Sequence, residues 1–161
     1  MREVPKPVKD FISSKKLKSL AVGGTGILPS NVVSSVNGKR ITNKAKNRFE
    51  TNLEVLEYFK GNGIDFSSVY VATGGQGGKA GANQFADALV AAAAASKTGA
   101  PLVLSGAAAT EDDLAKAEDF IEKNIKEDGE LYIIGGSGVV SDSIEQKLEE
   151  KVGDFNVSEI S

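Results

Sequence analysis

Three of the residue types that carry most protein chemistry are missing from this chain. Its 161 residues contain no Cys, no His and no Trp. Without thiols and imidazoles there are no disulfides, no cysteine nucleophiles, no Cys or His metal sites and no Ser-His-Asp triad. Missing cysteine does not fix the cellular compartment, because both cytosolic and exported proteins can lack thiols. The sequence thus excludes much of the usual catalytic repertoire before any motif is considered.

Long apolar runs are also lacking. The first residues, MREVPKPVKDFISSKK, contain no apolar stretch of signal-peptide length. No segment approaches the roughly 18 apolar residues of a membrane span, so membrane insertion is not expected. An excised domain of an exported protein would lack its leader in the same way. The hydrophobic fraction of 40% is enough to fill the core of one domain.

Charge is unevenly distributed along the chain. Residues 1–50 carry eleven Lys and Arg against three Asp and Glu, a balance of +8, whereas the remainder carries eight against nineteen, a balance of −11. This asymmetry fits an anionic partner that meets the first third of the chain. It fits equally well a set of solvated lysines that complement the acidic part. No interleaved aromatic residues or recognition-helix pattern accompany the basic segment, so nucleic acid is not an expected partner.

Glycine-rich stretches raise the question of a nucleotide site. Around Lys79 the spacing fits a phosphate-binding loop, but Thr73 stands where the first glycine belongs and Ala80 where the hydroxyl should follow the lysine. The two Gly-Gly-Ser/Thr-Gly stretches have Pro29 and Ser141 in place of the third glycine of a dinucleotide fingerprint. We interpret these glycines as scaffold that permits sharp turns, and no cofactor is expected.

Short apolar runs alternate with helical periods. Near-continuous apolar strands separated by helices indicate an α/β fold with a parallel sheet covered on both faces. The strands are expected at residues 19–24, 68–74, 100–106 and 130–136. Helices are expected at 47–61, at 83–99 with Asn83 as its N-cap, at 110–125 with Thr110 as its N-cap, and from 141 onward.

The acidic side chains show no spacing that demands catalysis. No two carboxylates are paired as glycosidase or metal chemistry requires. Asp87 is expected to be a fold residue near the base of the glycine-rich loop. The acids of the 110–125 helix are expected to form its solvent-facing side: Asp112, Asp113, Glu118, Asp119 and Glu122. We predict no catalytic residue and no enzyme.

An internal repeat is the most informative feature. LAVGGTGILPSNV (20–32) aligns with YIIGGSGVVSDSI (132–144) at an offset of 112 residues. The match extends backward to DFI at 10–12 and 119–121, and forward to GKRI and VSEI, which end at Ile41 and Ile160. We therefore expect 1–161 to be one module in which 1–41 resembles the tail of a preceding repeat and 42–160 is one complete repeat. Such a pattern is what cutting a module from a tandem array would produce.

These motifs together resemble a known family. Four motifs resemble those of the cell wall-binding repeat 2 family and occur in the same order. They are VYVATG, FADAL with an alanine-rich helix, KTGAPLVLSG and LYIIGGSGVVSDSIEQKL. The chain departs from the family pattern at Asn43, Asn47 and Phe49, where glycine, aspartate and tyrosine are usual, and its loop between Gly74 and Phe85 is longer. The departures leave the fold unaffected and bear on ligand details.

The resemblance implies a noncatalytic anchor. Members of the family are Rossmann-like (flavodoxin-like) modules, three in tandem in a threefold arrangement, on secreted Gram-positive cell wall and S-layer proteins. They hold an anionic cell wall polysaccharide noncovalently. Carried over by position, the polymer-binding residues are Pro101, Leu102, Val103 and Leu104, with Arg40 and Arg48 as further candidates for bidentate contacts to anionic groups, and Lys79 facing polymer or solvent.

Two other hypotheses stay open on the sequence. The residues 102–104 are equally explained as a plain buried strand, with function only at the strand's end. A nucleotide- or sugar-phosphate-binding enzyme or sensor, with its ligand at the glycine turns, is the alternative function. A purely structural module, in which another region meets the wall, is the third.

Overall fold

The computed structural model describes residues 3–75, 85–152 and 156–160. The chain divides into two compact units, Met1–Tyr58 and Phe59–Ser161. Both are mixed α/β with parallel strands, as the alternation of apolar runs and helical periods predicts. None of the helices in the described ranges has the length and apolar character needed to cross a membrane.

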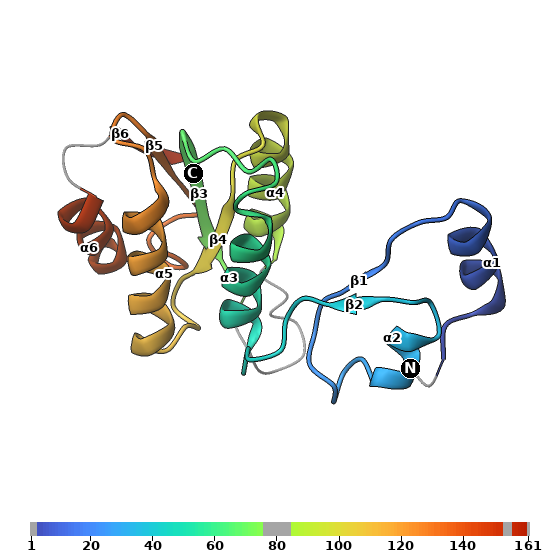
Figure 1. The fold of residues 1–161 in the computed structure, drawn as a ribbon. Coiled ribbons are helices and arrows are strands. Elements are labelled where there is room, and N and C mark those ends of the chain that lie inside the picture. The colour runs from blue at the N-terminus through green and yellow to red at the C-terminus, as the bar shows by residue number, and fades with distance from the viewer. Residues whose placement is uncertain (1–2, 76–84, 153–155, 161) are drawn as a thin grey trace. The chain divides into compact units, whose positions relative to one another are not determined.

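The second unit is built on a four-stranded parallel sheet (Figure 1). Its strands are β3 (Ser68–Thr73), β4 (Leu102–Ser105), β5 (Glu130–Ile134) and β6 (Asn156–Ile160), in the order β4-β3-β5-β6. Three of these strands were expected from their apolar runs. The fourth, β6, was not expected as a strand, because NVSEI is too polar to read as a buried strand.

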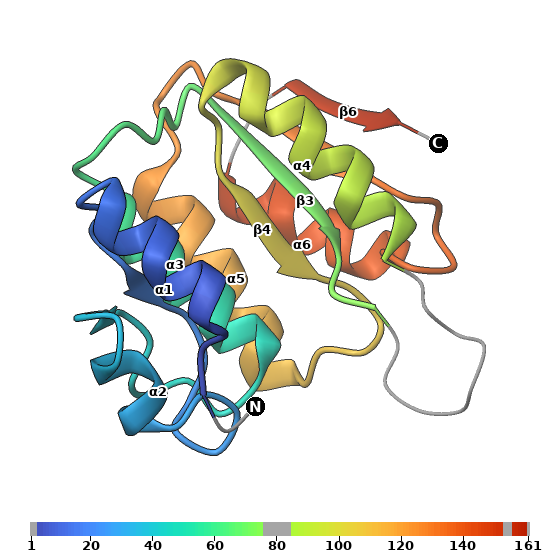
Figure 2. The ribbon, with the colours of Figure 1, turned by 90° about the vertical axis from the view of Figure 1, so that its right-hand side faces the viewer.

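Helices cover both faces of this sheet. Figures 1 and 2 show α4 (Ala86–Thr98) on one face, with α5 (Glu111–Asn124) and α6 (Asp142–Val152) on the other. Ala91 and Ala95 are buried, and Ala91 forms a core cluster with Ala72 and Ile134. The smooth alanine surface therefore lets α4 lie close to the sheet, as expected. The helix begins at Ala86 after Phe85, and the expected cap, Asn83, lies outside the described residues.

The start of α5 confirms one prediction and corrects another. Thr110 is the N-cap, and its hydroxyl accepts a hydrogen bond from the Asp113 N–H at 3.2 Å while the Asp113 carboxylate accepts from the Thr110 N–H. This capping box buries Asp113, which is only 4% exposed, and Glu118 is also buried at 7%. The expectation that both acids lie on the solvent face was wrong: Asp113 turns inward to cap, and Glu118 belongs to the buried side of the helix.

The first unit contains a smaller parallel sheet. Its elements are α1 (Lys6–Ser14), β1 (Leu20–Ala21), α2 (Ser30–Ser34), β2 (Lys39–Arg40) and most of α3 (Arg48–Phe59). In this sheet β1 pairs with β2. The run at 19–24 thus forms a strand as expected, but it belongs to a separate two-stranded sheet and not to the larger one.

The two copies of the repeat have the same backbone conformation at the glycine turn after the strand. Gly23 and Gly135, which correspond at the 112-residue offset, have φ of +118° and +117°, a region that favours glycine. Equivalent hydrogen bonds close the turns that follow. The Leu28 N–H donates to the Gly24 carbonyl oxygen, and the Val140 N–H donates to the Gly136 carbonyl oxygen. The strand registers also agree: Ala21 pairs with Arg40, and Ile133 pairs with Glu159. The sequence match of GKRI to VSEI is therefore a match of strands β2 and β6.

Candidate functional site

The carboxyl ends of β3, β4 and β5 meet at one edge of the large sheet. Thr73 and Ser105 end neighbouring strands in register with each other, and both are buried. The Thr73 hydroxyl accepts a hydrogen bond from the Gly75 N–H at 3.3 Å. At this edge Gly106 leaves β4 with φ +102° and packs against the turn after β5. In open parallel sheets, ligands bind beside such strand ends.

The predicted residues Pro101–Leu104 run along β4, at the border of the four-stranded sheet. Pro101 and Val103 are buried, whereas Leu102 and Leu104 are partly exposed. Leu102 packs against the core cluster beneath α4. The side chains at 101–104 thus belong mainly to the core, and a role of this segment in polymer binding stays a prediction.

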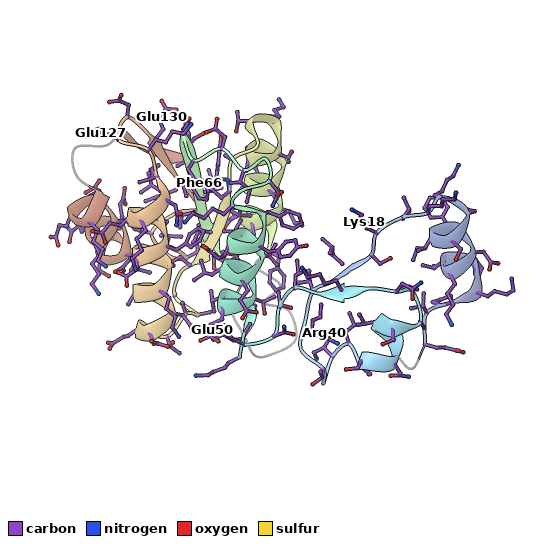
Figure 3. All side chains as sticks on the ribbon, viewed as in Figure 1. Lys18, Arg40, Glu50, Phe66, Glu127 and Glu130 are labelled. Carbon is purple, nitrogen blue, oxygen red and sulfur yellow. The ribbon has the colours of Figure 1, made fainter. Side chains whose placement is uncertain are left out.

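Arg40 has a role in the first unit that the sequence did not reveal. From β2 it reaches the turn after β1, where its two terminal nitrogens donate to the carbonyl oxygens of Gly23 and Leu28 (Figure 3). These two carbonyls lie at opposite ends of the glycine turn, and the planar guanidinium bridges them. Two of its five N–H donors are in use in these bonds. Its role toward an anionic polymer stays a prediction.

Thr42 completes this arrangement and was also missed. Its side chain is almost fully buried, and its hydroxyl accepts a hydrogen bond from the Gly23 N–H at 2.7 Å. The repeat offers a signal that could have found it, because the residue at the same phase of the second copy, 119 positions later, is also a hydroxyl residue, Ser161. Arg40 and Thr42 together fix the turn Gly23–Leu28 from the end of β2.

The other predicted cations lie apart from β4 in the chain. Arg48 is exposed in the first turn of α3, and its guanidinium lies 5.7 Å from the ring centre of the buried Phe49. Like Arg40 it belongs to the first unit, whereas Pro101–Leu104 belong to the second. Lys79 lies outside the described residues.

Asp87 sits where the sequence placed it, at the base of the glycine-rich loop. It lies in the first turn of α4, and its carboxylate would be 3.1 Å from a Cβ built on Gly135. The Asp87 side chain therefore lies against Gly135, at the start of the turn after β5. Among the described residues, no cluster of three or more Asp and Glu is arranged to hold a metal ion.

Two carboxylates with lowered pKa values form ion pairs that connect separate elements. The Asp65 carboxylate accepts hydrogen bonds from Lys126 and Ser67, which lower its pKa to about 2. A hydrogen bond from Lys151, on α6, holds the pKa of Asp119, on α5, below its usual value. These carboxylates are solvent-accessible and join loops or helices, so their shifts reflect structural pairing.

Comparison with known proteins identifies a family and a similar solved structure. The family model "Cell wall binding domain 2 (CWB2)" matches residues 43–145. Among solved structures, the chain is similar to Cwp8 from Clostridium difficile, with a TM-score of 0.58 and 23% sequence identity. That similarity covers 91% of this chain and 23% of the Cwp8 chain, so it concerns the fold of a part of that protein. No curated protein matches.

Proposed function

Because the chain belongs to the Cell wall binding domain 2 family, we propose that it is a noncatalytic module that anchors a secreted protein to an anionic cell wall polymer. The match over residues 43–145 is the observation that carries the proposal. The protein it serves is a surface or S-layer protein of a Gram-positive cell. Binding is noncovalent and depends on charge.

The strand order supports a Rossmann-like fold of the flavodoxin type. When the strands of the second unit are numbered from β3, the order β4-β3-β5-β6 becomes 2-1-3-4. This is the order of the first four strands of the flavodoxin-like sheet. In this order the connection from β3 leads to one side of the sheet, to β4, and the later connections lead to the other side, to β5 and β6. The carboxyl ends of β3 and β5 therefore flank the point where the strand order reverses, which is where such sheets bind ligands.

The repeat supports the proposed domain organisation. Residues 1–41 are the tail of a preceding repeat and 42–160 are one complete repeat, within which the family match begins at residue 43. The α1-β1-α2-β2 segment has the same order and strand register as α5-β5-α6-β6. Sister repeats in a threefold arrangement are partners of the module. An exposed apolar stripe on and beside α4, formed by Phe85, Leu89 and Val90, suits such contacts.

The charge distribution supports an anionic ligand. Eleven of the nineteen Lys and Arg lie within residues 1–50. Their exposed members include Lys15, Lys16 and Lys18, close together in the chain after α1. Interactions among exposed charges are screened over about 10 Å at 0.1 M salt, so binding that relies on them weakens as salt is raised. The proposed contacts are the end of β4 in the second unit and, separately, Arg40 and Arg48 in the first.

Wall retention tests this function. The 161-residue chain is attached to beads, which supply avidity for a weak single contact, and the beads are mixed with purified Gram-positive walls. We expect the walls to be retained, released by raised salt, and not retained after their anionic polymer has been stripped. Equal retention of stripped walls would contradict the proposal. A thermal shift with a nucleotide in the same chain would favour the alternative of a nucleotide-binding domain.

A further inference from the structure

The first unit exposes an unusual amount of apolar side-chain surface. Val8, Phe11, Leu20 and Val22 are 45%, 57%, 42% and 49% exposed. They come from α1 and from the segment of β1. We call these four side chains, together with the unpaired edge of β1, the open face. Exposed apolar surface of this kind marks a site that another element covers.

The second copy of the repeat shows what covers the strand part of this face. At the 112-residue offset, Leu20 and Val22 correspond to Tyr132 and Ile134. Ile134 is only 6% exposed and lies in the core cluster with Ala72 of β3 and Ala91 of α4, and Tyr132 packs against that cluster. The positions that are exposed in the first copy are therefore covered by β3 and α4 in the second.

The side chains of the open face that come from α1 are likewise covered at the equivalent positions of the second copy. The DFI match places Val8 and Phe11 at the positions of Ala117 and Phe120 on α5, 109 residues later. Ala117 is buried, and the ring of Phe120 lies 6.0 Å from that of Phe66, two residues before β3. Phe11 has the aromatic ring for this contact, but in its own unit it is largely exposed to solvent.

In the part of the chain that the structure describes, the backbone of β1 pairs with a strand on one side only. The carbonyl oxygens of Ser19 and Ala21 accept hydrogen bonds from Lys39 and Ile41, at the side of β2. The N–H and C=O groups of successive residues point to alternate sides of a strand. Those of Leu20 and Val22 therefore point to the edge of β1 that faces away from β2. Within the described residues that edge carries no strand. In the second copy the same edge, on β5, is paired with β3, and the Glu130 N–H donates to the Ser67 carbonyl oxygen at 3.0 Å.

We propose that the open face is a docking surface for a strand and helix of the β3–α4 type from another repeat. The incoming strand pairs with β1 in the register that β3 has with β5, and its helix covers Leu20 and Val22. An aromatic residue at the position of Phe66 meets Phe11. This inference rests on the domain organisation proposed above and names the partner of its incomplete repeat. An unpaired parallel strand is a ready template for such addition.

The test supplies the missing segment from the chain itself. A second copy of residues 43–109 is joined directly ahead of Met1, because the 109-residue offset places Met1 at the position of Thr110. Hydrogen exchange of the Leu20 and Val22 amides is compared in the extended and original chains. We expect exchange in the extended chain to slow on the order of tenfold or more, since both amides gain partners and lose contact with solvent.

A pair of substitutions makes the test specific. Val22→Glu places a charge under the incoming helix, whereas Ile27→Glu changes a residue that is 80% exposed and whose counterpart, Val139, lies outside the core cluster. In the extended chain we expect Val22→Glu to lower the melting temperature by roughly 5 °C or more and Ile27→Glu to have little effect. In the original chain both changes should be nearly neutral.

Three outcomes would overturn the proposal. The first is unchanged amide exchange in the extended chain, and the second is an equal effect of Val22→Glu in both chains. The third is concentration-dependent protection of Leu20 and Val22 in the original chain, which would assign the open face to a second whole copy. Wall retention is a separate readout: if the extended chain protects these amides but retains no walls, docking stands and the proposed function fails.

Discussion

The carbonyl oxygen of Val139 lies so close to Gly106 that a Cβ built on that glycine would be only 2.6 Å away. The contact joins the end of β4 to the turn after β5, and the neighbouring Ala107 N–H donates to the same oxygen at 3.0 Å. Gly106 also has φ +102°, which L residues rarely adopt. Two independent constraints therefore require glycine at the sheet edge where the ligand crevice is proposed.

Gly106→Ala should destabilise the second unit. The methyl group meets backbone, which cannot swing aside, and the φ is unfavourable, so we expect a loss of about 2–4 kcal/mol in the free energy of unfolding. Urea denaturation followed by circular dichroism measures it. Gly138→Ala is the matched control, because a Cβ at Gly138 would meet nothing within 4 Å. Equal denaturation midpoints for the two variants would contradict the tight contact.

The capping box at the start of α5 gives a second prediction. Thr110→Ala removes the hydroxyl that accepts from the Asp113 N–H, and it leaves the buried Asp113 carboxylate without its 2.7 Å bond from that hydroxyl. We expect a loss of about 1–2 kcal/mol in unfolding free energy. Thr110→Ser keeps the hydroxyl and should stay within a few tenths of wild type. A serine variant as unstable as the alanine variant would show that packing of the threonine methyl group dominates.

Apolar periodicity predicted the elements that have a buried face. The runs before Thr73, Ser105 and Ile134 became β3, β4 and β5, and the alanines of α4 became its sheet-facing surface. These predictions succeeded because the spacing of apolar residues within a short segment shows which side of a strand or helix is buried. The strands β2 and β6 were not predicted from apolar periodicity, because backbone hydrogen bonds and register set their pairing with β1 and β5. The repeat did align them, and it is the stronger guide for such polar strands.

Side-chain roles were harder to predict than elements. The contact of the Arg40 guanidinium with two carbonyls of its own unit was not predicted, and its contact with anionic groups is untested. Glu118 and Asp113 were expected in solvent and are buried, so those two predictions were wrong. All three side chains are placed by neighbours that the fold brings to them, and the periodicity of the sequence does not reveal those neighbours. The polymer contacts at β4, Arg40, Arg48 and Lys79 remain predictions for the same reason.

The bridging role of Arg40 is testable by substitution. Arg40→Gln removes the charged donors to Gly23 and Leu28, and we expect a local loss of about 2–4 kcal/mol. The Gly23 amide, which donates to the buried Thr42 hydroxyl, should then exchange faster with solvent. Arg40→Lys keeps the charge but cannot span both carbonyls, so it should also accelerate exchange. If the Gly23 amide is as protected in Arg40→Lys as in wild type, the positive charge alone stabilises the turn and the bridge between the two carbonyls is not needed.

Arg48 provides the test of polymer contact by charge. Arg48→Glu places an acid among the basic residues of the first unit, and repulsion of an anionic polymer should weaken wall retention by about two- to fivefold at low salt. The control is Lys123→Glu, an exposed charge reversal in the acidic second unit. Retention is measured with walls at increasing salt, where the difference between the variants should shrink. Unchanged retention by Arg48→Glu would favour a purely structural first unit.

The Asp65 pairing predicts how stability depends on pH. Its pKa is lowered from 3.8 to about 2 in the folded chain, chiefly by the Lys126 hydrogen bond. A lowered folded-state value means that Asp65 contributes stability above its unfolded pKa, and that this contribution is lost as pH falls from about 4 toward 2. Asp65→Asn should therefore lower the urea midpoint at pH 7, and the difference from wild type should diminish steadily below pH 4. Lys126→Gln should raise the Asp65 pKa toward its usual value in an NMR titration of the carboxyl carbon, because the largest cause of the shift is gone. A wild-type Asp65 that titrates near 4 would show that the ion pair at 2.8 Å does not persist in solution.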